Sequence, residues 1–212
     1  MKAVTVRPGV ADSVRLEDVP EPAREEGAVL VETVAVGVCA TDREIVAGAY
    51  GEAPPGRDRL AIGHESLGRV VEAPAESGVA PGDLVAGIVR RPDPVPCESC
   101  AVGEWDMCRN GKYTEHGIKG LDGFARERFR LDVPFVVRID PGLGLRGVLL
   151  EPASIVAKAW DQIDRIAARS RWTPARCLVL GAGPVGLLAA LFAALRGLEL
   201  HVLDRATDGP KP

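Results

Sequence analysis

The segment 178–204, LVLGAGPVGLLAALFAALRGLELHVLD, decides the fold of the last third of this protein. Its glycines Gly181, Gly183 and Gly186 form the pattern G-x-G-x-x-G, with apolar runs on either side. A glycine pattern between a strand-like run and a helix-like run is typical of the first turn of a β-α-β unit. We therefore predict a strand, a helix and a second strand over residues 177–180, 184–195 and 198–203.

The same pattern predicts a dinucleotide site. The glycines allow a tight turn, a close approach of the pyrophosphate and close packing of helix on strand, and the helix N-terminus attracts phosphate. Asp204 could accept hydrogen bonds from the ribose of NAD, and Arg205 could neutralise the 2′-phosphate of NADP, so both cofactors stay open. The alternative is a glycine-rich turn without a ligand. The predicted cofactor-binding residues are Gly181, Gly183, Pro184, Val185, Gly186, Asp204 and Arg205.

Composition places the chain among ordinary globular proteins. Of its 212 residues, 46% are hydrophobic and 26% are charged, and the net charge is −4, which argues against nucleic acid as the main partner. Nineteen residues, Cys177–Leu195, carry no charge, but three glycines and a proline favour a buried strand, turn and helix over a membrane span. The N-terminus shows no secretory signal, and the cysteines suit a reducing compartment, so we expect a cytoplasmic protein without membrane or nucleic-acid partners.

The chain divides into a β-rich part and an α/β part. We expect a catalytic domain at 1–150, a connecting helix and loop at 151–175, and an incomplete nucleotide-binding domain at 176–212. Apolar residues at helical spacing, among them Val156 and Ile163, predict the connecting helix. The strands expected in the first part are Met1–Val6, Ser13–Val19, Ala28–Val36, Ser66–Glu72, Asp83–Val89 and Phe124–Ile139.

Three loop residues of the β-rich part predict a metal site. Cys39 lies in GVCATD, and His64 and Glu65 lie in GHES. Thiolate, imidazole and carboxylate are all zinc ligands, and catalytic zinc usually has three protein ligands and one open position. Glu151, at the start of the connecting helix, could be a third or alternating carboxylate ligand. Taken singly, Cys39 would be read as a buried thiol and His64 as a hydrogen-bonded loop histidine.

These motifs carry a family resemblance. GVCATD, GHESLGRVVE, PGDLVAG and GAGPVG, in this order and spacing, resemble the zinc-dependent medium-chain dehydrogenases, which join a GroES-like domain to a Rossmann domain. The block 89–127 is similar to the glucose 1-dehydrogenase branch. The resemblance implies that Thr41 and Glu115 contact a sugar, that Glu151 lies at the zinc and the substrate, and that the whole protein is a homo-oligomer.

The resemblance implies a reaction that transfers hydride from C1 of an aldose to NAD(P)⁺ and yields an aldonolactone. Zinc lowers the pKa of a bound hydroxyl, Thr41 could relay the proton, and Glu65 is the second expected catalytic residue. Glu115 would orient the sugar, or would be merely a solvated loop charge. Two other readings stay open. One is another alcohol or polyol dehydrogenase of the family, and the other is a silent remnant that binds zinc or another chain.

Two features depart from the family. Many relatives hold a structural zinc with four cysteines, but Gly103 and Gly111 stand at two of those positions. The chain has Cys97 and Cys100 at the other two positions, and Cys108 falls elsewhere. These three cysteines could hold zinc with an Asp or His, or could hold no metal. The segment after 176 provides one β-α-β unit, whereas a Rossmann domain has about six strands. We therefore expect a truncated enzyme with little or no dehydrogenase activity by itself.

Overall fold

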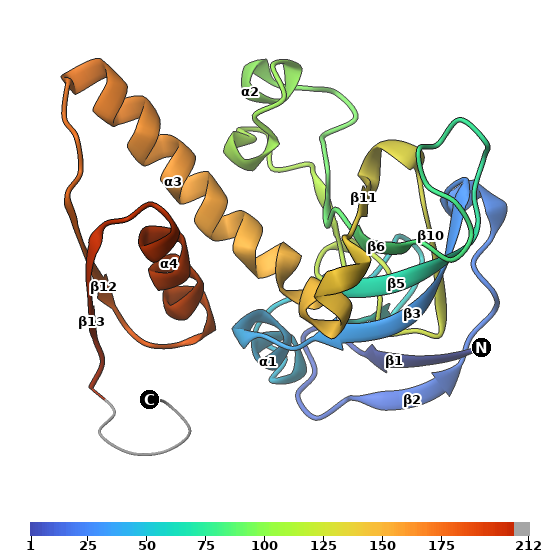
Figure 1. Cartoon of the computed structure of the whole chain (residues 1–212). Coiled ribbons are helices and arrows are strands. Elements are labelled where there is room, and N and C mark those ends of the chain that lie inside the picture. The colour runs from blue at the N-terminus through green and yellow to red at the C-terminus, as the bar shows by residue number, and fades with distance from the viewer. Residues whose placement is uncertain (206–212) are drawn as a thin grey trace. The chain divides into compact units, whose positions relative to one another are not determined.

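The protein, seen in a computed structural model that describes residues 1–205, consists of two compact units, Met1–Leu149 and Leu150–Pro212 (Figure 1). The first unit is built from three small or medium sheets with short helices between their strands. The second unit contains helices and a parallel strand pair. The predicted succession of a β-rich part, a long helix and a β-α-β unit is confirmed.

The main sheet of the first unit has five antiparallel strands in the order β10-β3-β5-β6-β11. Its core is apolar, because Val31 and Val85 on its strands pack with Phe124 and Phe129, all of them fully buried. Burying each such side chain stabilises the fold by about 1.5–3 kcal/mol. The strands are β3 (Val29–Gly37), β5 (Glu65–Glu72), β6 (Leu84–Gly87), β10 (Arg128–Leu131) and β11 (Val136–Arg138).

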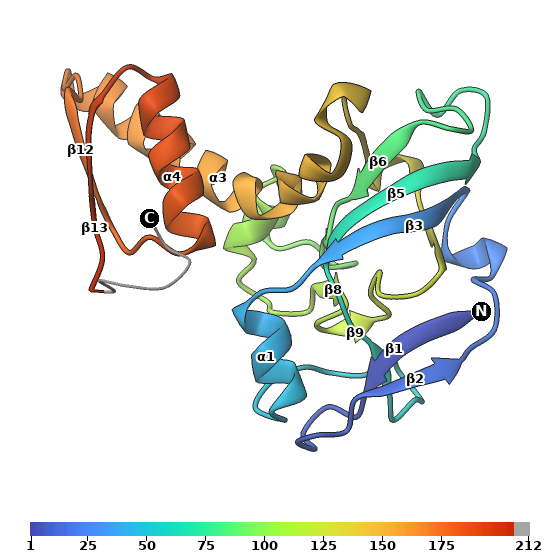
Figure 2. The same ribbon diagram turned by 60° about the horizontal axis from the view of Figure 1, so that its bottom comes forward.

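Two three-stranded sheets complete the first unit, in the orders β2-β1-β4 and β7-β8-β9. Figure 2 separates β1 and β2 from the β3-β5-β6 layer and shows α1 directly after β3. The elements are β1 (Lys2–Val6), β2 (Arg15–Asp18), β4 (Leu60–Ala61), β7 (Arg90–Arg91), β8 (Thr114–His116), β9 (Gly120–Leu121), α1 (Ala40–Val46) and α2 (Glu98–Ala101). Short 3₁₀ turns lie at Arg24–Glu26, Trp105–Met107, Val133–Phe135 and Pro141–Leu149.

One strand prediction was wrong. The expected strand over 124–139 is two strands, β10 and β11, separated by a 3₁₀ turn at Val133–Phe135. Pro134 explains the break, because proline has no N–H to donate to a sheet ladder and suits the first turn of a helix. The helix α1 was not predicted, since its seven residues are too few for a clear apolar periodicity.

The second unit consists of α3 (Leu150–Ser170), β12 (Arg176–Leu180), α4 (Pro184–Leu195) and β13 (Glu199–Leu203). The two strands are parallel, with Cys177 opposite Leu200, and α4 connects them. Trp160 and Val156 of α3 pack with Ala193 of α4 in the core of this unit. Ile155 and Ile166, which also fit the helical spacing, are more than half exposed.

The apolar helix α4 buries only part of its surface in the part of the chain that the structure describes. Leu188 and Phe192 pack against the core, whereas Leu187 is 42% exposed and Leu195 is 76% exposed. Several large apolar side chains of α4 are therefore only partly covered within residues 1–205. Among residues 1–205, no helix combines the length and the apolar composition that crossing a membrane requires.

His116 of β8 is a buried neutral histidine. Its ring stacks on Phe124 with 4.9 Å between centroids, and its Nδ1–H donates to the carbonyl oxygen of Asp122 at 2.7 Å. Burial, with a smaller contribution from the charge of Arg91, lowers the pKa of His116 from 6.5 to about 3. Protonation of this residue therefore favours the unfolded chain.

His116 should make stability depend on pH in mildly acidic solution. Its contribution is complete above the unfolded pKa of 6.5 and is lost as the pH falls toward 3, because only the unfolded chain then binds the proton. Between pH 7.5 and pH 5.0 the metal-free wild type should lose about 2 kcal/mol more than His116→Gln, at about 1.4 kcal/mol per pKa unit. Urea unfolding at the two pH values measures this difference, and equal losses in the two proteins would contradict it.

Candidate metal and dinucleotide sites

The predicted ligands Cys39, His64 and Glu65 meet in the first unit. Strand pairing brings them together, because Gly37 at the end of β3 is the register partner of Glu65 at the start of β5. Cys39 follows β3 by two residues and caps α1, while His64 immediately precedes β5. The Cys39 Sγ lies 3.2 Å from His64 Nε2, and the ligand atoms of all three residues lie within 4.8 Å of one another.

Asp42 connects the two loops from behind and was not identified from the sequence. Its side chain is buried, its Oδ2 accepts the Cys39 backbone N–H at 2.9 Å, and its Oδ1 lies 3.5 Å from His64 Nδ1. Burial favours a raised pKa for Asp42, but the contact with His64 and the hydrogen bond from the Cys39 backbone outweigh it and lower the pKa below its usual value. A carboxylate behind a histidine of this kind fixes which ring nitrogen faces a metal. The spacing C-x-x-D at a helix start was the available sequence signal.

The Glu65 carboxylate fits in its position only because residue 37 is a glycine. A Cβ built on Gly37 would collide with Glu65 Oε2, so glycine at this position leaves room for the carboxylate. Glu65 is 9% exposed, and burial raises its pKa while the nearby His64 lowers it in part. A buried carboxylate without a compensating positive charge is costly, and a bound cation would offset that cost.

The donor set fits zinc. Zinc sites in proteins are commonly made of thiolate, imidazole and carboxylate ligands from separate loops. In addition, the Asp42 carboxylate lies beside His64 Nδ1, the ring nitrogen that does not face Cys39. Thr41 is the second residue of α1, is half-buried, and donates its backbone N–H to Cys39 Sγ at 3.3 Å. Glu151 is half-buried in the first turn of α3, in the second unit, and its place in the ligand set stays a prediction.

Glu115 is a buried member of an ion pair, so its interpretation as a solvated loop charge is wrong. It lies on β8 and is 9% exposed. Its Oε1 accepts from the Arg90 guanidinium at 2.8 Å. Its predicted contact with a sugar stays a prediction.

The three remaining loop cysteines also meet. The ligand atoms of Cys97, Cys100 and Cys108 lie within 4.8 Å of one another, and Cys97 Sγ is 3.7 Å from Cys100 Sγ. The backbone N–H of Arg109 lowers the pKa of Cys97 to about 6, whereas burial raises the pKa of Cys100 to about 11. Within residues 1–205 no Asp or His joins this group at that distance. The cluster therefore provides three sulfur ligands, and zinc there stays a prediction.

The glycine turn of the second unit needs glycine at two positions and leaves open space at a third. Gly181 has φ +103°, and a Cβ on Gly186 would collide with the Gly181 carbonyl oxygen. A Cβ on Gly183 would meet no atom within 4 Å, so open space lies beside the residue that precedes α4. The Gly183 position is therefore compatible with close approach of a phosphate.

Asp204 takes part in this turn, because its Oδ2 accepts the Ala182 backbone N–H at 2.6 Å. The other predicted contacts, Pro184, Val185 and Arg205, are exposed. An exposed Pro184 and Val185 at the first turn of α4 leave the helix N-terminus open to an anion. The contact of Asp204 with a ribose and that of Arg205 with a 2′-phosphate stay predictions.

Comparison with known proteins finds dehydrogenase domains over most of the chain. Residues 25–141, more than half of the chain, match the alcohol dehydrogenase GroES-like domain, and residues 145–212 match the glucose dehydrogenase C-terminus. The chain is 45% identical over 201 residues to glucose 1-dehydrogenase of Methanocella arvoryzae. It is 45% identical over 214 residues to glucose 1-dehydrogenase of Thermoproteus tenax. These matches span 94% and 100% of this chain but 56% and 60% of the two relatives.

A solved structure of a relative has a similar fold. The chain superimposes with a TM-score of 0.85 and 38% identity on Haloferax mediterranei glucose dehydrogenase in complex with NADP, Zn and gluconolactone. The superposition covers 99% of this chain and 59% of that structure. An alcohol dehydrogenase of Aeropyrum pernix matches with a TM-score of 0.72 and 26% identity. The β-rich fold, the ligand cluster and the matched domain together lead to one conclusion. The chain belongs to the family of dehydrogenases with an alcohol dehydrogenase GroES-like domain.

Proposed function

We propose that this chain carries the zinc site and part of the dinucleotide site of an aldose 1-dehydrogenase, with glucose as the favoured substrate. The observation that carries the proposal is the meeting of Cys39, His64 and Glu65 in one group. The relatives named glucose 1-dehydrogenase, and the relative solved with NADP, Zn and gluconolactone, support it. The cytoplasmic location stays a prediction. The homo-oligomer, which the family resemblance implies, also stays a prediction.

The residues of the first unit would prepare the sugar hydroxyl. Cys39, His64 and Glu65 would hold zinc, which when bound acts as a Lewis acid and lowers the pKa of a hydroxyl. In the proposed reaction the C1 hydroxyl loses its proton through Thr41, and the C1–H leaves as hydride, so that C1 becomes the carbonyl carbon of a lactone. Glu115 would orient the sugar by accepting a hydrogen bond from another hydroxyl.

The residues of the second unit would bind the hydride acceptor. The Gly183 position leaves space for the pyrophosphate, and the N-terminus of α4 favours its negative charge. Asp204 suits a ribose hydroxyl and Arg205 suits a 2′-phosphate, so we propose that both NAD and NADP bind. A preference above about a thousandfold, roughly 4 kcal/mol, would contradict this dual use.

Glucose binding should depend on zinc. The chain should first carry serine at Cys97, Cys100 and Cys108, so that only one zinc site remains. In that background Cys39→Ser should lower the zinc content from about one per chain to near zero. Catalytic zinc sites have only about three protein ligands, so loss of the Cys39 thiolate should remove most of the affinity. Glucose titrations followed by NMR should then show binding only with Cys39 present. Equal zinc content and equal glucose binding in the two proteins would contradict the proposal.

Dinucleotide binding should depend on the open space at Gly183. Gly183→Val fills this space with a side chain and should weaken NADP⁺ and NAD⁺ binding at least about tenfold, or 1.4 kcal/mol. Ala157→Val, at an exposed position of α3, is the matched control in the same unit and should leave both affinities unchanged. Calorimetric titration measures them. Unchanged affinity in folded Gly183→Val would show that the dinucleotide does not use this turn.

A further inference from the structure

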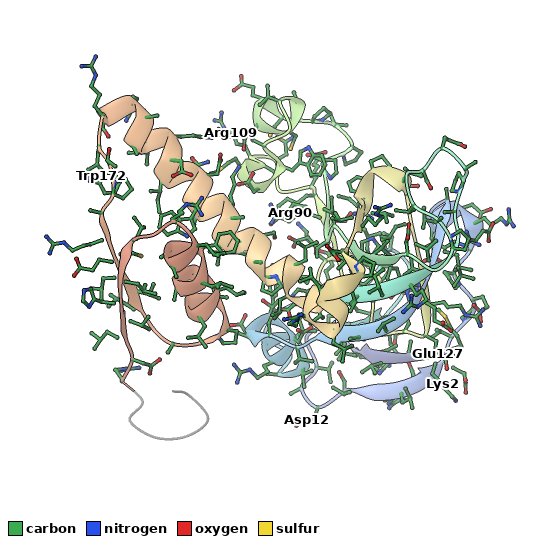
Figure 3. All side chains as sticks on the ribbon, in the orientation of Figure 1. Lys2, Asp12, Arg90, Arg109, Glu127 and Trp172 are labelled. Carbon is green, nitrogen blue, oxygen red and sulfur yellow. The ribbon has the colours of Figure 1, made fainter. Side chains whose placement is uncertain are left out.

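Arg90 and Glu115 form a cross-strand pair outside the metal cluster. They are register partners of the antiparallel strands β7 and β8, so their side chains lie on one face. Arg90 Nε and Nη2 donate to the same carboxylate oxygen, Glu115 Oε1, at 3.0 and 2.8 Å. Figure 3 labels Arg90 where the loop that carries α2 joins the sheets. The Arg90 guanidinium therefore directs both of its hydrogen bonds with Glu115 to the same oxygen, Oε1.

The second carboxylate oxygen has no such partner. Among residues 1–205, no hydrogen bond or ion pair of Glu115 involves Oε2. The Glu115 side chain is only 12% exposed, but Oε2 is not among the fully buried atoms that lack a partner, so this oxygen stays accessible to a ligand. A hydroxyl of a ligand is a suitable donor, and its bond to an ionised oxygen is stronger than a neutral one.

Arg90 is itself held in place. Its Nη1 donates to the Trp105 carbonyl oxygen at 3.2 Å, and its guanidinium carbon lies 4.0 Å from the centre of the Tyr113 ring. The Lys119 ammonium lies 4.4 Å from the same ring centre and donates to the Gly111 carbonyl oxygen. A planar guanidinium with fixed partners can hold a carboxylate in one orientation, which a lysine cannot do to the same degree.

We propose that Arg90 is a positioning residue for sugar recognition, which holds Glu115 so that Oε2 accepts a hydrogen bond from a substrate hydroxyl. This inference rests on the proposed function, because that proposal assigns the sugar contact to Glu115. Arg90 does not touch the sugar and acts only through Glu115. A site built to accept a hydroxyl discriminates strongly against a ligand that lacks it, so the pair would also contribute to substrate selectivity.

A double-mutant cycle on glucose affinity tests the proposal. The zinc-loaded chain and the variants Arg90→Met, Arg90→Lys, Glu115→Gln and Arg90→Met/Glu115→Gln are titrated with D-glucose by NMR. Arg90→Met should weaken binding about tenfold, and Arg90→Lys should weaken it less, because lysine keeps the charge but not the fork. In the Glu115→Gln background, Arg90→Met should change the affinity by less than about twofold, since residues in direct contact are not additive.

A matched ion pair is the control. Arg57 pairs with Asp122, whose side chain is 15% exposed, in the same unit. Arg57→Met should leave glucose affinity unchanged. If Arg90→Met has no effect, or the same effect in both backgrounds, the pair is structural and the inference is overturned. Arg90→Lys decides the question if Arg90→Met does not fold.

The proposed function and this inference fail in different ways. Equal glucose affinity of wild type and Glu115→Gln removes the sugar contact from Glu115 and overturns both the contact and the role of Arg90. Failure of the zinc-loaded wild type to bind glucose contradicts the proposed substrate. Additive effects of Arg90→Met and Glu115→Gln, with zinc content and glucose binding intact in the wild type, overturn the role of Arg90 alone.

Discussion

The candidate metal site depends on one buried carboxylate, that of Asp42. Its two oxygens face two different loops, because one accepts the N–H of Cys39 and the other lies beside Nδ1 of His64. A buried charge without partners is strongly unfavourable, so these contacts are needed for the fold as well as for the site. They leave the Cys39 sulfur and His64 Nε2 facing each other at 3.2 Å. Two of the predicted metal ligands are thus brought together by contacts within the protein.

Strand pairing also helps to position the residues proposed to bind metal and sugar. The long pairing of β3 with β5 brings the Cys39 loop next to His64, and glycine at position 37 leaves space for the Glu65 carboxylate. The next strand pair, β7 and β8, holds Glu115 through Arg90 in a similar way. Asp42 and Arg90 are both charged residues that contact a side chain or loop which we propose to touch metal or sugar. Such support is typical of precise functional sites.

The sequence was sufficient where the signal is local. The glycine turn, α4 and the flanking strands follow from residues 177–203, because apolar runs and glycine spacing directly reflect backbone geometry. The grouping of Cys39, His64 and Glu65 could be predicted from their ligand chemistry together with their place upstream of the glycine turn. The structure brings these three side chains together, although the sequence says nothing about the strand register that does so.

The sequence was insufficient where partners are distant in the chain. The contact of Asp42 with His64 and that of Arg90 with Glu115 join positions separated by more than twenty residues, and no periodicity announces them. The strand predicted over 124–139 failed at Pro134, where a local signal was present but was outweighed by the apolar run. Glu115 was open to interpretation as a solvated charge because burial of a loop residue depends on tertiary packing.

Zinc affinity of Asp42→Asn tests most directly whether this carboxylate organises the metal site. Asp83→Asn is the matched control. Asp83 Oδ2 accepts the Ala80 N–H at 3.0 Å, with the same three-residue spacing as Asp42 and Cys39, and Asp83 directly follows the turn at 81–82. With serine at the three clustered cysteines 97, 100 and 108, competition with a chelator gives the affinity of the remaining site. We predict that Asp42→Asn binds zinc about 10- to 100-fold more weakly than the parent, and that Asp83→Asn binds it equally well. Equal affinity in Asp42→Asn and the parent would contradict the central role of Asp42.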